Sequence, residues 1–237
     1  MTEMLKIVWG GTFRKDVPVE EARSHWANVH GPLALKAAGM VGYVQSHVVG
    51  AIAHRQIVDR PVFLDGYSVQ WWADRDTFSR ALNSPEWDAV RVDDKTIFSS
   101  ASSGTSAVLQ PRVIQDGPRL PFKVVWFACF LPHIDPEEAS DHWLRHGSIA
   151  IESGEVGRYV QNLVIGGIKN GSITRDKIRY DGFSECWFAD RAAYERAVAS
   201  EPWARLEQDA ATLFDTAAMA DGMSAVLEEH VIRDPES

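Results

Sequence analysis

Apolar stretches alternate with charged and turn-forming segments along the first half of the chain, at spacings that predict both strands and helices. Pro18 followed by two glutamates is typical of a helix start, and Gly39 is typical of the end of that helix. Asp74 predicts the N-cap of a second helix. Four further segments are apolar and rich in β-branched or aromatic residues and predict strands: 4–10, 41–49, 67–72 and 105–113. The resulting order, β-α-β-β-α-β, is that of a ferredoxin-like split unit.

The second half of the chain repeats this pattern at an offset of about 116 residues, as between Tyr43 and Tyr159. Asp135 and Asp190 predict helix N-caps in the second copy. The order of the matching blocks is preserved, and chance does not produce such a match. These blocks are Leu5–Trp9 with Phe122–Trp126, His25–Trp26 with His142–Trp143, His30–Gly31 with His146–Gly147, Tyr43–Gln45 with Tyr159–Gln161, and Asp65–Ser68 with Asp181–Ser184.

The repeat predicts two domains, residues 1–115 and 120–237, joined by the turn-rich segment Gln115–Pro121. One such unit has a four-stranded antiparallel sheet, and its two helices cover only one face of that sheet. The second copy is therefore expected to cover the other face, so that the two sheets pack together or close into a barrel with the helices outside. This arrangement allows two related cavities, each between a sheet and its own helices.

Composition and charge restrict the classes of protein. Of the 237 residues, 45% are hydrophobic, which is enough for a sizeable core. The net charge of −9 argues against nucleic acid or an anionic membrane as a partner, because both require a basic surface. Cys129 and Cys186 lie in apolar runs and are expected to be small buried hydrophobes, and the reducing cytoplasm is the expected compartment. No apolar run approaches the roughly 18 residues that span a bilayer.

The repeated blocks resemble the EthD-like family of the dimeric α+β barrel superfamily. In the first copy the resemblance rests on Trp26–Pro32, Gly42–His47 and Asp65–Tyr67, and in the second copy on Trp143–Gly147, Tyr159–Asn162 and Asp181–Phe188. It implies an α+β fold in which two fused ferredoxin-like βαββαβ units form an intramolecular dimeric α+β barrel. Proteins of this kind include isomerases, decarboxylases and cyclases of aromatic compounds, cofactor-free monooxygenases and accessory proteins, and more distant barrel proteins bind haem.

The two copies differ at positions that belong to the family pattern. Val69 occupies the position of Glu185, and Leu163 occupies the position of His47. The second copy also has one residue fewer between its tryptophan and its histidine. We therefore expect at most one complete site of the family type, in the first copy.

The candidate catalytic residues gather in the first copy: His30, Tyr43, His47 and His54. Because Tyr43, Gln45 and His47 alternate along one predicted strand, they share one face of it. The resemblance places His30 at the end of the first helix, facing the sheet, and His54 in the loop after the strand. Two imidazoles and a phenol beside an apolar cavity suit proton transfer at a carbonyl or a phenol without a cofactor.

The residues expected to bind substrate come from both copies: Trp26, Gln45, Tyr67, Trp71, His146, Tyr159, Gln161 and Glu185. Structural alternatives stay open. A histidine before glycine can simply interact with the C-terminus of its helix. The nine tryptophans can fill the interfaces between helices and sheets, with only some of them forming a flat pocket for an aromatic substrate.

A metal site is not expected. His25 and His30 are five residues apart and do not share a face of an α-helix, whereas His142 and His146 do. No carboxylate cluster adjoins the second pair along the sequence, so a third ligand is missing. The long segments 49–64 and 166–179 are candidate lids over the cavities, with solvated hairpins as the alternative.

These observations favour a cofactor-independent acid/base enzyme of the lyase, decarboxylase or isomerase type. It would act on an aromatic or enolisable small molecule, in aromatic catabolism or polyketide-type metabolism. The alternatives are a cofactor-free or haem-assisted monooxygenase and a non-catalytic accessory or binding protein. A monomer and a homodimer are both compatible with the internal duplication.

Overall fold

The computed structural model describes residues 4–99, 105–169, 172–174, 176, 178–219 and 222–235. The elements of the first repeat are β1 (Leu5–Gly11), α1 (Val19–His25), the π-helix η1 (Trp26–His30), α2 (Gly31–Ala34), β2 (Met40–Ala53), β3 (Gln56–Val58), β4 (Gly66–Trp72), α3 (Arg75–Ala81), α4 (Pro85–Ile97) and β5 (Ala107–Gln115). Those of the second repeat are β6 (Phe122–Ala128), α5 (Pro136–Ile151), β7 (Val156–Lys169), β8 (Ser172–Thr174), β9 (Gly182–Phe188), α6 (Arg191–Ala199), α7 (Glu201–Leu213) and β10 (Ser224–Arg233).

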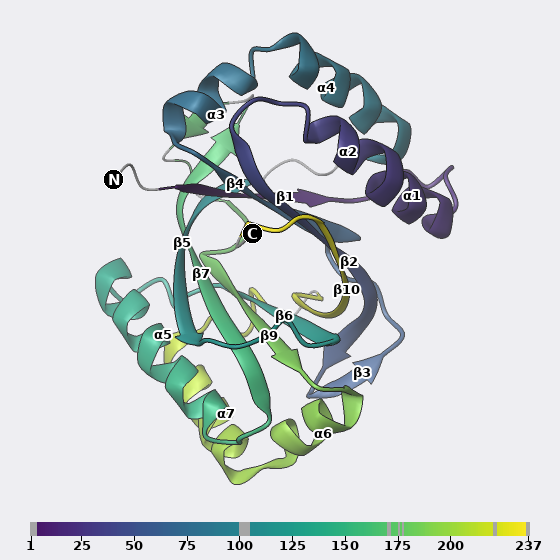
Figure 1. The fold of residues 1–237 in the computed structure, drawn as a ribbon. Helices are drawn as coiled ribbons and strands as arrows, with labels where there is room; N and C mark the ends of the chain where they lie inside the picture. The colour runs from purple at the N-terminus through teal and green to yellow at the C-terminus, as the bar shows by residue number, and fades with distance from the viewer. Residues whose placement is uncertain are drawn as a thin grey trace.

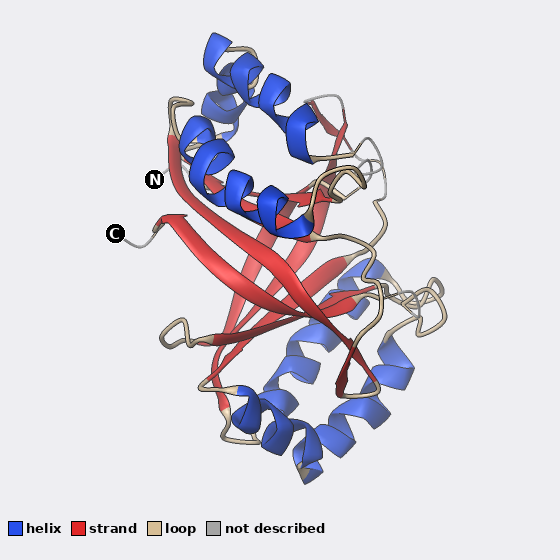
Figure 2. Ribbon diagram, turned by 90° about the vertical axis from the view of Figure 1, so that its right-hand side faces the viewer, coloured by secondary structure: helices blue, strands red, loops and turns tan. Residues whose placement is uncertain are grey.

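The two sheets close into one barrel with a helical layer on each side (Figures 1 and 2). The strand order is β10-β6-β9-β7-β5-β1-β4-β2, and antiparallel pairing of β10 with β2 completes the ring. The two seams between the repeats are equivalent, because each repeat's last strand pairs with the first long hairpin strand of the other, β5 with β7 and β10 with β2. The predicted architecture of two ferredoxin-like units in one α+β barrel is confirmed.

Local signals placed most of the elements correctly. Asp74 accepts a hydrogen bond from the backbone N–H of Thr77, and Asp190 accepts one from that of Ala193, as expected of N-caps. The sequence reading missed the short strands β3 and β8, and it missed the division of the second helix of each repeat into two. The division in the first repeat follows from Ser84, which caps a new helix that begins at Pro85.

The long segments predicted as lids form hairpins that pack on the opposite repeat. Ile52 and Ile57 of the β2–β3 hairpin belong to the apolar core beneath the helices of the second repeat. Arg55 at its tip donates a 2.9 Å hydrogen bond to the carbonyl of Val198 on α6. Ile168 of β7 packs reciprocally in the core of the first repeat. Each hairpin therefore covers the other copy, and residues 170, 171, 175 and 177 of the second segment lie outside the described residues.

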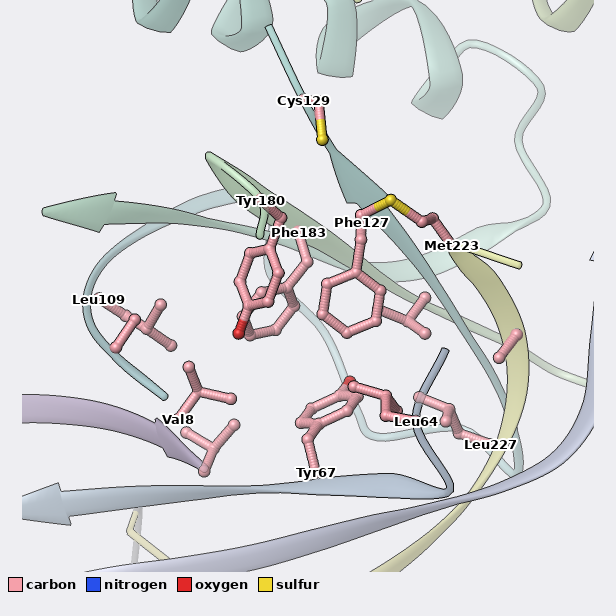
Figure 3. Packing of buried hydrophobic residues seen from close by; sticks show 14 residues of the cluster. Val8, Leu64, Tyr67, Leu109, Phe127, Cys129, Tyr180, Phe183, Met223 and Leu227 are labelled. Carbon is pink, nitrogen blue, oxygen red and sulfur yellow. The ribbon is translucent and has the colours of Figure 1, made fainter. Parts of the chain in front are cut away.

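The barrel interior is filled by apolar side chains from both repeats (Figure 3). Tyr67 of β4 packs against Phe127 of β6 and Phe183 of β9, with ring centroids 5.9 and 5.3 Å apart. All three side chains are fully buried. Since these contacts join strands of different repeats, neither inner sheet face is covered without the other copy.

A charged network is also buried in the barrel interior. One carboxylate oxygen of Glu185 accepts a 2.8 Å hydrogen bond from the Tyr67 hydroxyl and lies 2.7 Å from Nζ of Lys123. Its second oxygen accepts from Asn162, which in turn accepts from Lys6. Burial opposes the charge of Glu185, but the two lysines outweigh it and lower the pKa of its carboxyl to about 2. Burial lowers the pKa of Lys6 to about 8, against the attraction of Glu185.

Glu185→Gln is expected to lower the free energy of unfolding by about 3 kcal/mol at neutral pH, because the buried Lys6 loses its nearby carboxylate charge and Lys123 keeps only Glu229. The depressed pKa means that this stabilisation is present above pH 4.5 and is lost as the pH falls toward 2. Urea denaturation followed by tryptophan fluorescence measures both effects. Glu195→Gln, which removes an exposed ion pair with Arg191, serves as the control and should leave the midpoint unchanged. An equal effect of the two substitutions would contradict the stabilising role assigned to the buried carboxylate of Glu185.

Candidate active site

A cavity of about 1030 Å³ lies between the outer face of the first repeat's sheet and its helices. A smaller cavity, of about 350 Å³, lies at the matching place in the second repeat. Related cavities at these two places are what the duplication led us to expect. The threefold difference in volume shows that the two cavities are no longer equivalent.

The first cavity has flat apolar walls, a few inner polar groups and a charged rim. Its apolar wall is formed by Trp9, Trp26, Leu82, Trp87, Val90 and Phe98. The inner polar side chains are His30, Tyr43, Ser68 and Gln70. The charged side chains at its rim are Arg14, Lys15, Asp16, Arg91, Asp94 and Lys95. An apolar pocket with a small number of convergent polar groups is the usual form of a small-molecule site.

The helix that carries His30 contains the π-helical turn η1 between α1 and α2. Trp26 and His30 are four residues apart, whereas Trp143 and His146 are three apart, so the first copy has one extra residue. A π-helical turn accommodates one extra residue within a helix, and such turns are frequent at functional sites. His30 therefore keeps the place in the first repeat that His146 has in the regular helix α5.

One carboxylate of the first repeat bridges two histidines. Asp93 of α4 lies 2.9 Å from Nδ1 of His30 and 2.9 Å from Nε2 of His25. The expectation that these histidines do not share a helical face is wrong, because residues five apart lie together in a π-helical turn. Since an ionised carboxylate can only accept, Nδ1 of His30 donates to Asp93, and Nε2 takes no part in that hydrogen bond. Nε2 lies 3.6 Å from Asp94, whose pKa is raised by partial desolvation and by the charge of Asp93, against the attraction of His30.

The second repeat contains the same bridge in a more apolar setting. Asp209 of α7 lies 2.7 Å from Nδ1 of His146 and 2.9 Å from Nε2 of His142. Ala210 stands where the first repeat has Asp94. Burial lowers the pKa of His146, although the contact with Asp209 opposes this. His146 is therefore a neutral imidazole at pH 7.

Sequence reasoning missed both bridging carboxylates. Asp93 and Asp209 each follow a repeat-matched tryptophan, Trp87 or Trp203, by six residues. This match could have identified them, but a single aspartate on an acidic helix surface carries little weight when its partners lie more than 60 residues away. The carboxylate that orients a histidine is as informative as the histidine itself.

Gln45 positions the phenol of Tyr43. Its amide nitrogen donates to the backbone carbonyl of Trp26 at 2.9 Å and to the Tyr43 hydroxyl at 3.2 Å. A Cβ atom at Gly31 would lie 2.9 Å from this nitrogen, so the glycine after His30 leaves room for the amide. Because Tyr43 accepts from Gln45, its own hydrogen is available to an acceptor in the cavity. Burial raises the pKa of Tyr43 to about 12, which keeps the phenol protonated.

His47 does not line the first cavity. Its ring stacks on Trp26 at 4.6 Å and faces His230 of β10 at 4.4 Å. Nε2 lies 3.1 Å from Oε1 of Gln45, and Nδ1 is buried with no hydrogen-bond partner among the described residues. Burial, helped by His230 and Arg23, lowers the pKa of His47 to about 3. The predicted common face of Tyr43, Gln45 and His47 is present, but His47 lies behind the cavity wall.

His54 belongs to the other cavity. It lies at the tip of the β2–β3 hairpin in the left-handed backbone region, and it lines the second cavity together with His146 and Tyr159. Sequence reasoning grouped it with His30 because the two residues are in the same copy. The exchange of hairpins between the repeats places it against the helices of the other copy.

Three residues predicted to bind substrate lie inside the barrel. The side chains of Tyr67 and Trp71 point inward from β4, whereas Ser68 and Gln70 of the same strand face the cavity. Glu185 of β9 points inward in the same way and holds the charged network. Alternation shows which residues share a face but does not say which face is inside. Of the other predicted residues, Trp26, His146 and Tyr159 line a cavity, and Gln161 matches Gln45 in supporting Tyr159.

In the described part of the chain, no group of three or more His, Cys, Asp or Glu side chains has the arrangement of a metal site. Each Asp–His₂ bridge is a single carboxylate hydrogen-bonded to two imidazoles, which is the geometry of oriented bases rather than of converging ligands. Within the same residues, no helix is long and apolar enough to cross a membrane.

A family model describes most of this chain. The model of the EthD domain matches residues 14–102 and 131–217, which includes both His–Asp bridges. No curated protein matches the chain significantly.

Several solved structures share the fold over nearly their whole length. A candidate monooxygenase of Fusobacterium nucleatum subsp. nucleatum superposes with a TM-score of 0.57 at 10% identity, covering 98% of this chain and 94% of that one. An anthrone oxidase-like protein superposes with a TM-score of 0.56 at 14% identity, covering 98% of this chain and 92% of that one. A candidate monooxygenase of Lactobacillus acidophilus superposes with a TM-score of 0.55 at 10% identity, covering 96% of this chain and 94% of that one. At these identities the likeness shows the fold.

His47→Leu, which introduces the residue found at the matching position 163, is expected to be tolerated and to make stability less dependent on pH. The folded protein holds His47 neutral down to a pKa of about 3, while the unfolded chain takes up the proton near pH 6.5. Wild type therefore loses stability as the pH falls below 6.5, and the variant should lose less. Urea midpoints between pH 7 and pH 5 measure the slope. An unchanged slope, or unfolding of the variant at pH 7, would contradict this reading.

Proposed function

The chain belongs to the EthD family, and from this membership and the geometry of the first cavity we propose that it is an enzyme that removes a proton from an aromatic small molecule. The substrate class is an enolisable or phenolic compound with fused rings. The proposal rests on the position of His30. Its Nδ1 is hydrogen-bonded to Asp93, and its ring lines an aromatic cavity together with the phenol of Tyr43.

His30 acts as the base. Its Nδ1–H donates to Asp93, which fixes the tautomer and leaves Nε2 to accept a proton from the substrate. The imidazolium that forms lies between Asp93 and Asp94, at 2.9 and 3.6 Å. Both carboxylates favour the charged form, so the arrangement stabilises the product of proton transfer more than the neutral base.

Tyr43 stabilises the substrate anion. When a proton leaves a carbon next to a carbonyl, the negative charge moves to the carbonyl oxygen. The Tyr43 hydroxyl is buried and remains protonated, and because it accepts from Gln45 it can donate its hydrogen to that oxygen. Trp9, Trp26 and Trp87 offer apolar faces on which the fused rings can stack. The resulting alignment would hold one methylene group against His30.

We propose that the anion then reacts with dioxygen. The carbanion transfers an electron to O₂, and recombination forms a C–O bond and a peroxide anion, which takes the proton from His30. Loss of water from the hydroperoxide turns the methylene into a carbonyl, so that one CH₂ and one O₂ give one C=O and one H₂O. Electrons come from the substrate alone. The names of the solved relatives, monooxygenase and anthrone oxidase-like, favour this fate. Nothing in the comparisons supports the lyase or isomerase class.

The first repeat is the proposed site of this reaction. Its cavity is large enough for three fused rings, and its histidine has a second carboxylate, Asp94, near Nε2. The second cavity has about a third of that volume, and Ala210 replaces this carboxylate.

Anthrone, whose methylene lies between two aromatic rings and opposite a carbonyl, is the probe. Purified protein is expected to consume dioxygen and release anthraquinone. His30→Gln should lower the rate by about 100-fold or more, which is the contribution of a positioned base. Asp93→Asn should lower kcat while changing KM little, because the asparagine amide can donate to Nδ1 of His30 and so favour the tautomer that has its proton on Nε2. An oxygen electrode and mass spectrometry of the product provide the measurements.

The duplication supplies the matched control, because His146→Gln and Asp209→Asn make the same changes in the other repeat and should leave the rate unchanged. Equal loss in both sets would indicate damage to the fold, and an undiminished rate in His30→Gln would overturn the proposal. Turnover of anthrone-type carbonyl compounds without oxygen uptake would favour the lyase or isomerase alternative.

A further inference from the structure

The second cavity carries a complete set of oriented polar groups that the proposed reaction does not use. His146 is held by Asp209 at 2.7 Å, and Gln161 donates to the hydroxyl of Tyr159 at 3.3 Å. The Tyr159 hydroxyl lies 3.0 Å from the hydroxyl of Ser184, which also lines the cavity. His146 and Tyr159 are buried. These hydrogen bonds fix the groups in place on the wall of an apolar cavity, which is the usual arrangement of a small-molecule site.

The charge of the second cavity differs from that of the first. The first cavity has four cations at its rim, of which Lys15, Arg91 and Lys95 are exposed. Among the described residues that line the second cavity, the charged side chains are Arg55 and Glu207, and these pair with each other at 2.9 Å. The described lining of the second cavity therefore offers no unpaired lysine or arginine to balance an anionic ligand.

The protonation states of the groups in the second cavity also favour an uncharged ligand. Burial lowers the pKa of His146 and raises those of Tyr159 and Cys186, so all three are neutral at pH 7. Because Tyr159 accepts from Gln161, it can donate to Ser184, which frees the Ser184 hydroxyl hydrogen for a ligand. Nε2 of His146 is the matching acceptor. A donor and an acceptor that line the same cavity suit a hydroxyl group, which both donates and accepts.

The shape of the second cavity limits the size of the ligand. The β2–β3 hairpin covers it, and Tyr194 fixes the hairpin by donating to the carbonyl of Arg55 at 2.9 Å. Apolar side chains form most of the remaining wall: Trp126, Trp143, Val198, Trp203, Leu206 and Phe214. A volume of about 350 Å³ accommodates one or two aromatic rings.

The geometry points to a second ligand site: the cavity of the second repeat binds a compact, uncharged aromatic hydroxy compound, whose hydroxyl donates to His146 and accepts from Ser184. This binding does not depend on the reaction proposed for the first cavity. The duplication has therefore produced two sites that differ in volume and in the charge of their lining.

The test uses 2-naphthol, which is uncharged at pH 7, and 6-hydroxy-2-naphthoate, which has the same rings and a carboxylate. Calorimetric titration of the full chain without oxygen avoids turnover. Wild type is expected to show a 2-naphthol binding event that His146→Gln and Ser184→Ala each weaken about tenfold, the effect of one lost hydrogen bond in a buried site. His30→Gln, the matched change in the first repeat, should leave this event unchanged. The carboxylate analogue should bind at least tenfold more weakly there.

Circular dichroism of each variant controls for the fold, and Ser184→Ala provides a second, smaller change if His146→Gln does not fold. The proposal is overturned if 2-naphthol does not bind, if its binding resists both substitutions, or if the carboxylate analogue binds this site equally well. Failure of anthrone turnover alone leaves these readouts unaffected, so the two proposals are tested separately.

Discussion

Each repeat has a sheet with two apolar faces, and its own helices can cover only one of them. The other face is buried only when Tyr67 of one copy meets Phe127 and Phe183 of the other inside the barrel. Closure then follows from strand pairing, β5 with β7 and β10 with β2, and from hairpins that cover the opposite copy. Because closure fixes the inner faces, the outer faces are left to form cavities with the helices. The stability of the barrel and the position of the candidate site are therefore consequences of one constraint.

The two copies have kept the parts that position groups and changed the parts that meet a ligand. Asp93 and Asp209 each bridge two histidines, even though the first copy has an extra residue that a π-helical turn absorbs. The cavity linings, by contrast, differ: the first has four lysines and arginines, the described lining of the second has Arg55, and Ala210 replaces Asp94. The inner face has also diverged, since Glu185 of the charged network corresponds to Val69.

The sequence predicted the repeat, the barrel and the helix caps because these depend on local patterns and on a match between the two copies. It predicted His30 and Tyr43 through their motifs, and both line the first cavity. It did not predict Asp93, whose partners are distant along the chain, and it did not show that Tyr67, a predicted substrate-binding residue, faces the barrel interior. Hairpin exchange moved His54 to the other repeat, which no local pattern indicates.

The most direct measurement is proton abstraction itself, followed by NMR as exchange of the anthrone methylene hydrogens for deuterium in D₂O without oxygen. The account predicts that wild type and His146→Gln accelerate this exchange well above buffer, whereas His30→Gln does not. Exchange at the buffer rate with wild type, or equal acceleration by His30→Gln, would contradict the claim that His30, held by Asp93, is the base of this protein.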